Sequence, residues 1–150
     1  RPLVKQEEYQ QQESRSVLEK LYGNSLKRFV NALYQGEKIK KEVTFTNTGR
    51  GPMYVRACCL FSSKEAEEGA RLLMGSSRWE LAEDGYYYYT DIVNPKERTE
   101  VLLYGLTWES EEEITDFDLT VYTESVQAAG HENSREAFAH LMEREEGQEK

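Results

Sequence analysis

The chain has few of the residues that would fix its compartment or staple its fold. Its 150 residues contain two cysteines, three prolines and two histidines. The cysteines, Cys58 and Cys59, are adjacent, and neighbours on a strand point to opposite faces, so they cannot join two separate elements. We expect one buried and one exposed free thiol, with a vicinal disulfide or a metal pair as the alternative. Cysteine usage therefore assigns no compartment.

Long apolar runs and clustered cations are also missing. No run approaches the 18 or more apolar residues of a membrane span. The chain opens with Arg1-Pro2 and shows no signal-peptide core; a removed leader and a trimmed chain would look the same. Its formal net charge is −9, which repels phosphate backbones and argues against nucleic-acid binding.

The composition is that of one folded domain rather than of a disordered chain. Apolar residues make up 38 % and charged residues 31 %, with ten Tyr, five Phe and two Trp. Disordered chains are poor in aromatics, and 150 residues suffice for one core. We predict a mobile N-terminal arm over 1–12, a single domain over 13–144 and a frayed tail over 145–150.

Hydrophobic residues at helical spacing predict helices in three places. The first place is the N-terminal part, with a stripe from Val17 to Tyr22 and another from Leu26 to Leu33, where a strand is the alternative. The second begins at Ser62, which forms a capping box with Glu65 and is followed by Ala66, Ala70, Leu73 and a stop at Gly75. The third is capped by Ser134 and carries Ala137, Phe138, Leu141 and Met142.

Alternation of apolar and polar residues predicts the strands. Lys41–Thr48 and Met53–Phe61 flank a Gly- and Pro-containing turn, as a hairpin or as a corner between two sheets. Further strands are expected at Trp79–Leu81, Tyr86–Val93, Glu100–Trp108 and from Phe117 onward. Leu102, Tyr104, Leu106 and Trp108 should share one face of their strand. The residues predicted to enter one core are Val43, Phe45, Val55, Ala57, Cys59, Phe117, Leu119 and Val121.

Strands that follow one another through turns, without β-α-β alternation, favour a mainly β fold. We predict an antiparallel β-sandwich with two or three peripheral helices.

Four motifs, in this order, resemble the TasA/camelysin family of exported Gram-positive proteins. They are Lys40–Gly49, ending in Asn-Thr-Gly; Met53–Arg56, with Tyr-Val-Arg; Trp79 followed by Asp84–Tyr89 and Asn94–Thr99; and Val121–Ala128. Lys96 stands where the family usually has Gly, which removes the residue best suited to a positive φ. The motif residues are Asn47, Gly49, Tyr54, Arg56, Trp79, Gly85, Tyr86, Tyr88, Pro95, Glu124 and Gln127.

The resemblance implies a jelly-roll-like sandwich that is secreted or held at the cell surface. Members of the family serve as subunits of fibres or of the extracellular biofilm matrix, and some are described as surface peptidases. The expected partner is another copy or a co-exported subunit, with the cell wall as a further candidate. An edge strand of the sandwich could be completed by an arm from a neighbour, for which Arg1–Gln12 is the candidate.

The residues themselves offer little for catalysis or for a cofactor. His131 and His140 are the only histidines, no H-E-x-x-H is present, and no motif flanks the cysteines. We therefore predict no catalytic, metal or cofactor-binding residues. The acidic run from Glu109 to Asp118 lacks the order of a calcium loop and is expected to be a solvated loop.

Three functions remain open from the sequence. We expect an assembly or matrix subunit that acts by protein–protein contact. A surface module for glycans or peptides is the alternative, with Tyr86–Tyr89 as its platform, although two of these tyrosines should face the core. A metal-dependent peptidase is the third.

Overall fold

The computed structural model describes residues 19–27, 34–114 and 117–148, with side chains over 34–114 and 117–141. The predicted arm over 1–12 lies outside them. The described elements are β1 (Glu19–Lys27), β2 (Lys38–Val43), β3 (Met53–Phe61), α1 (Lys64–Gly69), β4 (Ala70–Met74), β5 (Trp79–Leu81), β6 (Tyr87–Tyr89), β7 (Leu103–Trp108), β8 (Asp118–Gln127) and α2 (Ser134–Gln148).

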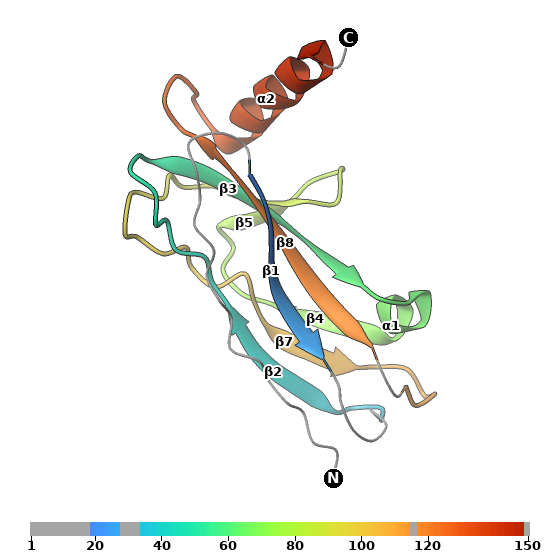
Figure 1. The fold of residues 1–150 in the computed structure, drawn as a ribbon. Helices are drawn as coiled ribbons and strands as arrows, with labels where there is room; N and C mark the ends of the chain where they lie inside the picture. Colours follow the sequence, from blue (N-terminus) through green and yellow to red (C-terminus); the bar gives the residue numbers. More distant parts are fainter. Residues whose placement is uncertain (1–18, 28–33, 115–116, 149–150) are drawn as a thin grey trace.

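The strands form two antiparallel sheets that face each other, which confirms the predicted β-sandwich (Figure 1). The five-stranded sheet has the order β1-β8-β3-β6-β5, and the three-stranded sheet has the order β2-β7-β4. β3 and β8 are the long central strands of the first sheet and pair along the whole of β3. Each strand can therefore bury one face against the opposite sheet.

The segment between β2 and β3 is a corner between the two sheets, because β2 pairs with β7 whereas β3 pairs with β8 and β6. Asn47, which is 1 % exposed, holds this corner. Its Nδ2 donates to the carbonyl oxygens of Gly51 and Val93, both at 2.9 Å, and its Oδ1 accepts from the backbone N–H of Gly49 at 2.8 Å. The Asn-Thr-Gly motif thus has a structural role here.

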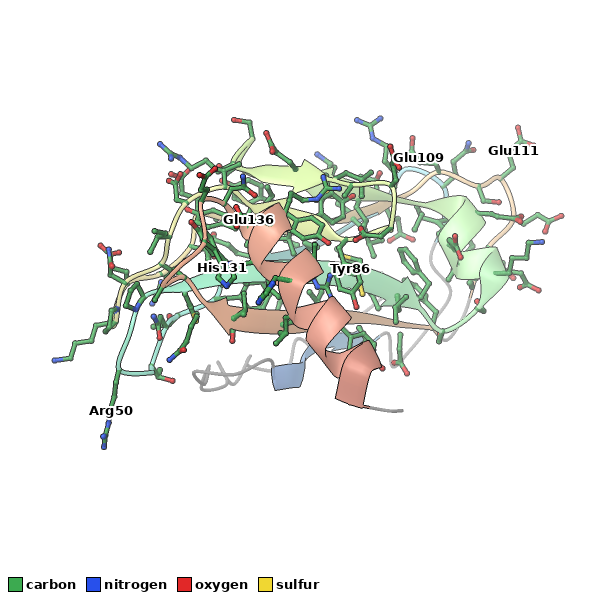
Figure 2. The ribbon with its side chains drawn as sticks, turned by 90° about the horizontal axis from the view of Figure 1, so that it is seen from above. Arg50, Tyr86, Glu109, Glu111, His131 and Glu136 are labelled. Carbon is green, nitrogen blue, oxygen red and sulfur yellow. The ribbon has the colours of Figure 1, made fainter. Side chains whose placement is uncertain are left out.

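α2 lies across the outer face of the five-stranded sheet (Figure 2). Ala137 and Phe138 are buried there, against Tyr54, Val126 and Ala128. Ala137, Phe138 and Leu141 of the predicted apolar stripe thus pack α2 on the sheet. The helix continues to Gln148 and so enters the segment 145–150 that we predicted as a tail.

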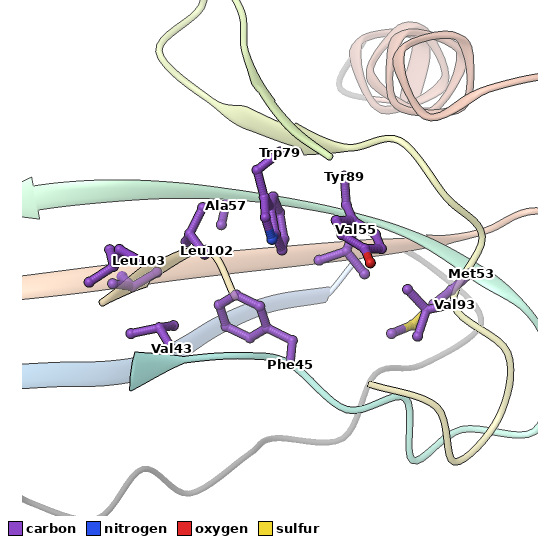
Figure 3. Close-up of a cluster of buried hydrophobic side chains, with 11 residues drawn as sticks. Val43, Phe45, Met53, Val55, Ala57, Trp79, Tyr89, Val93, Leu102 and Leu103 are labelled. Carbon is purple, nitrogen blue, oxygen red and sulfur yellow. The ribbon is translucent and has the colours of Figure 1, made fainter. Parts of the chain in front are cut away.

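The core between the sheets consists of two adjoining clusters of buried side chains. Figure 3 shows the first, in which Trp79 and Phe45 meet edge to face with ring centroids 5.9 Å apart. Seven of the eight predicted core residues are buried, and Cys59 is partly buried and packs against both clusters. Val43, Phe45, Val55, Ala57 and Val121 belong to the first cluster, and Phe117 and Leu119 to the second.

The helix predicted at the N-terminal end of the domain is wrong over 19–27, where the chain forms β1. This strand pairs with β8, from Glu19 opposite Ser125 to Lys27 opposite Asp118, with a register shift between Tyr22 and Asn24. Local spacing was compatible with either state, and a partner strand almost a hundred residues away decided it. The second predicted stripe, beyond residue 27, lies largely outside the described residues.

The helix predicted from Ser62 is shorter than expected and begins one residue later. Ser63 is the N-cap, with its Oγ accepting from the backbone N–H of Ala66 at 3.1 Å. The Oγ of Ser62 instead accepts from the N–H of Asp118. The chain leaves the helix at Gly69, where an added Cβ would lie 2.2 Å from the Trp108 ring, and continues as β4. Pairing with β7 overrides the helical spacing of Ala70 and Leu73.

Two further predictions fail at irregular backbone. Tyr104 is 50 % exposed and does not share the buried face of Leu106 and Trp108. Between them, Gly105 has φ 138°, and an added Cβ would lie 1.9 Å from the Ile39 carbonyl oxygen, so β2 and β7 meet closely at a bulge.

The predicted strand Tyr86–Val93 is reduced to β6 and a single bridge from Val93 to Met53. In the turn that follows, Lys96 has φ 71° and adopts the left-handed conformation without being Gly.

Burial across the sandwich predicts that Leu106→Ala lowers the free energy of unfolding by roughly 2–5 kcal/mol, because Leu106 is fully buried in the second cluster. Leu81→Ala is the matched control: Leu81 is 63 % exposed, so its loss should change stability by no more than about 0.5 kcal/mol. Urea denaturation followed by circular dichroism measures both. Equal losses would contradict the described packing.

Candidate functional site

A row of polar side chains crosses the outer face of the five-stranded sheet. Glu124 of β8 lies opposite Arg56 of β3, and Arg56 lies opposite Tyr88 of β6. The Arg56 Nε donates to Glu124 Oε1 at 2.9 Å, and its Nη1 donates to the Tyr88 hydroxyl at 3.0 Å. The Tyr88 hydroxyl in turn donates to Asp84 Oδ2 at 2.6 Å. Strand register therefore aligns Glu124, Arg56 and Tyr88, and the turn before β6 adds Asp84 to a continuous chain of hydrogen bonds.

The ion pair in this row is buried under aromatic rings. Arg56 is 6 % exposed and Glu124 is 2 % exposed. The guanidinium carbon of Arg56 lies 4.1 Å from the ring centre of Tyr86 and 4.6 Å from that of Phe138, which belongs to α2. Cation–π attraction and the carboxylate together offset the loss of water around the guanidinium.

The protonation states follow from these contacts. Burial alone would lower the pKa of the Arg56 guanidinium, but its contacts with Tyr88 and Glu124 raise it instead. Burial, and then a hydrogen bond to Glu124, raise the pKa of Tyr86. Burial would raise the pKa of the Asp84 carboxyl, but the bonds from Tyr88 and from the backbone of Tyr86 lower it. At neutral pH Arg56 is therefore a cation, Asp84 is a carboxylate, and Tyr86 is a neutral phenol.

A cleft of about 620 Å³ opens beside this row, between α2 and the segment before β6. Its size is in the range of small-ligand sites. Figure 2 shows Tyr86 beneath α2 and Glu136 on the helix itself. The residues that line the cleft are Arg56, Asp84, Tyr86, Tyr88, Glu124, Arg135, Glu136, Phe138 and Ala139.

The structure brings four of the motif residues together in this cleft, namely Arg56, Tyr86, Tyr88 and Glu124. The others lie elsewhere. Tyr54 packs under α2, and Trp79 is in the core between the sheets. Asn47, Gly49 and Pro95 belong to the corner loops; Gly85, with φ 87°, forms the turn before β6; and Gln127 is exposed at the end of β8.

The four consecutive tyrosines divide as predicted. Tyr87 and Tyr89 pack into the core between the sheets, whereas Tyr86 and Tyr88 face α2. Tyr88 is 5 % exposed, and its hydroxyl is held by Arg56 and Asp84. Tyr86 and Tyr87 are both half-buried, and of these two Tyr86 is the one that lines the cleft.

Three polar residues of the cleft were missed from the sequence as site residues: Asp84, Arg135 and Glu136. Asp84 was visible only as part of an Asp-Gly turn. Arg135 and Glu136 are ordinary first-turn residues of a helix, and only the docking of α2 brings them to the cleft. The apolar pair Ala137 and Phe138 was the one available signal that this helix packs on the sheet.

Candidate metal ligands are sparse in the part of the chain that the structure describes. No group of three or more His, Cys, Asp or Glu side chains is placed there to hold a metal ion. The rings of His131 and His140 have centroids 5.4 Å apart, and the nearest carboxylate, Glu136, lies 3.8 Å from His131 Nδ1. Cys58 and Cys59 are both free thiols, as predicted, but both are half-buried rather than one buried and one exposed.

Comparison with known proteins found no matching family model, no matching curated protein and no matching solved structure. The resemblance to the TasA/camelysin family therefore rests on the four sequence motifs. Within the described residues, neither helix is both long and apolar enough to cross a bilayer.

The buried ion pair predicts a thermodynamic cycle. Arg56→Met should lower the free energy of unfolding by about 3–5 kcal/mol, because it leaves the Glu124 carboxylate buried without its cation. Arg56→Met combined with Glu124→Leu should recover most of this loss, since two apolar side chains need no counterion. Urea titrations of the two single variants and the double variant measure the coupling. A double variant no more stable than Arg56→Met would show that the pair is not coupled.

The two thiols should react at different rates in the native protein. Burial raises the pKa of Cys59 to about 12, and burial also raises that of Cys58, by less. Because the thiolate is the reactive form, a thiol reagent at pH 8 should modify Cys58 first. Mass spectrometry of Cys58→Ser and Cys59→Ser variants assigns the two rates. Without reductant, both thiols should react in denaturant; finding none would reveal a disulfide.

Proposed function

We propose that the protein acts through protein–protein contact, as an assembly subunit whose copies join by exchanging an edge strand. The observation that carries this proposal is the position of β1. Among the described strands it pairs with β8 alone and lies at the edge of the sheet. A strand of this kind can leave its own β8 and pair with the β8 of another copy, which is a low-cost route to assembly.

The other three sheet edges are less suited to adding a strand. β2 carries exposed Lys38 and Lys40 and a register shift before Val43, and lysines and bulges both discourage edge pairing. β4 has a register shift between Leu73 and Met74. β5 is only three residues long. β8 is ten residues long and offers the longest template once β1 has left.

Exchange would conserve the interactions that β1 makes. Each backbone hydrogen bond between strands contributes only about 0.5–1.5 kcal/mol net, but the same bonds form within one copy or between two. The balance then depends on protein concentration and on the strain of the connection between β1 and β2, rather than on new contacts. In this proposal the exchanged strand is β1, whereas the sequence suggested the arm over 1–12 as the donor.

The cellular location and the role in a matrix are supported by the motif resemblance alone. On that ground we propose a secreted or cell-surface protein of the biofilm matrix, with another copy or a co-exported subunit as its partner. A β-sandwich by itself is compatible with many functions.

Strand exchange predicts cross-links between chains that each carry one engineered cysteine. In a Cys58→Ser/Cys59→Ala background, Ser25→Cys is placed in one sample and Thr120→Cys in another, because these residues lie opposite each other. Mixing at high concentration followed by oxidation should give a covalent dimer, measured by non-reducing electrophoresis. The yield should rise with concentration and incubation time.

Two controls separate exchange from collision. Ser25→Cys mixed with Thr90→Cys should give little dimer, because Thr90 is exposed but lies beyond β6, away from β8. A chain that carries both Ser25→Cys and Thr120→Cys, oxidised before mixing, should be locked as a monomer. Equal dimer yields with Thr120→Cys and Thr90→Cys would rule out the exchange.

A further inference from the structure

Arg135 is a cation at the mouth of the cleft whose hydrogen-bonding groups are uncommitted. Its guanidinium carbon lies 4.7 Å from the ring centre of Tyr88. Among the described residues it makes no hydrogen bond and no ion pair within 4 Å, although its charge helps to lower the pKa of Asp84. A guanidinium whose carbon lies over a ring still has its N–H donors available for a planar anion such as a carboxylate.

The carboxylates beside Arg135 are already held by donors of the protein. Asp84 accepts from the Tyr88 hydroxyl and from the backbone N–H of Tyr86, at 2.6 and 2.9 Å. Glu136 accepts from the N–H of Glu132 at 3.3 Å and lies 3.8 Å from His131 Nδ1. Neither carboxylate neutralises Arg135 by direct contact, yet each oxygen keeps a lone pair that can accept from a further donor.

The walls of the cleft add an aromatic surface. Tyr86 is half-buried, and the guanidinium carbon of Arg56 lies over its ring. Phe138 lines the cleft on the side that α2 forms. The buried pair of Arg56 and Glu124 below contributes no net charge. The cleft thus offers one free guanidinium, carboxylates that accept hydrogen bonds, and a tyrosine ring, in about 620 Å³.

We propose that this cleft binds an acidic glycan, with a uronic-acid carboxylate on Arg135 and the sugar ring against Tyr86. A uronic acid carries the anion that the guanidinium requires and also hydroxyl groups that can donate to Asp84 and Glu136. An acidic peptide supplies the anion and backbone N–H donors, but not a ring that carries several hydroxyl donors beside its carboxylate. The flat face of a sugar packs on tyrosine in the same way as other apolar surfaces. This site is independent of strand exchange, because it lies on the outer face under α2 and not at an edge.

Isothermal titration of the full chain tests the proposal with three probes: trigalacturonic acid, neutral maltotriose and the peptide triglutamate. Trigalacturonic acid should bind, and the other two should bind at least about tenfold more weakly. Arg135→Gln should weaken trigalacturonate binding at least about tenfold, the loss expected for a charge-assisted hydrogen bond. Arg50→Gln is the matched control with binding unchanged, because Arg50 is exposed on a loop far from Tyr86 (Figure 2).

A second pair of variants tests the ring. Tyr86→Phe keeps the aromatic face and should bind within about threefold of the parent, whereas Tyr86→Leu should bind at least about tenfold more weakly. Thermal melts confirm that each variant is folded. Absent binding of trigalacturonate at millimolar concentration, equal binding by Arg135→Gln, or triglutamate binding as tightly as the uronide would each overturn the proposal.

Discussion

β3 and β8 run side by side from Met53 opposite Gln127 to Phe61 opposite Leu119, and this pairing supports both faces of the sheet. Because side chains alternate along a strand, a single register directs Val55 and Val121 toward the opposite sheet and Arg56 and Glu124 toward α2. A slip of one residue would place the ion pair in the apolar core. The inward apolar side chains therefore fix the register, and the register in turn builds the ion pair.

The outer face shows how a costly interaction can still be useful. A buried ion pair stabilises a fold little when the cost of desolvation is included. Here, however, the guanidinium of Arg56 contacts rings from β6 and from α2, as well as Glu124 of β8. These directional contacts restrict how α2 can lie on the sheet more strictly than an apolar contact would. The cleft beside the helix depends on that placement.

Edges and faces of the sandwich carry different kinds of interaction. An edge offers backbone donors and acceptors, which any strand of suitable length can use, so it favours assembly. The outer face offers a fixed set of side chains, namely a guanidinium, carboxylates and tyrosine rings, which select a ligand by its chemistry. The proposed strand exchange would use an edge, and the proposed glycan site would use the outer face.

The sequence by itself determined the β-sandwich, the long strand Met53–Phe61, most of the core and the division of the tyrosine run. These depend on alternation within a few residues, and burial of one strand face follows directly from it. Tertiary structure decided what local spacing left ambiguous. It made β1 a strand instead of a helix, and it made β4 a strand where the second half of a helix was predicted. It also exposed Tyr104 beside the bulge at Gly105.

The same distinction holds for the cleft. Arg56, Tyr86, Tyr88 and Glu124 were picked out as motif residues, but no local pattern could show that they meet, because strand order places three separate segments side by side. Arg135 joins them only through the docking of α2 by Ala137 and Phe138. A site assembled across strands and a helix has no signature at short sequence separation, and only the packed sheet brings it into being.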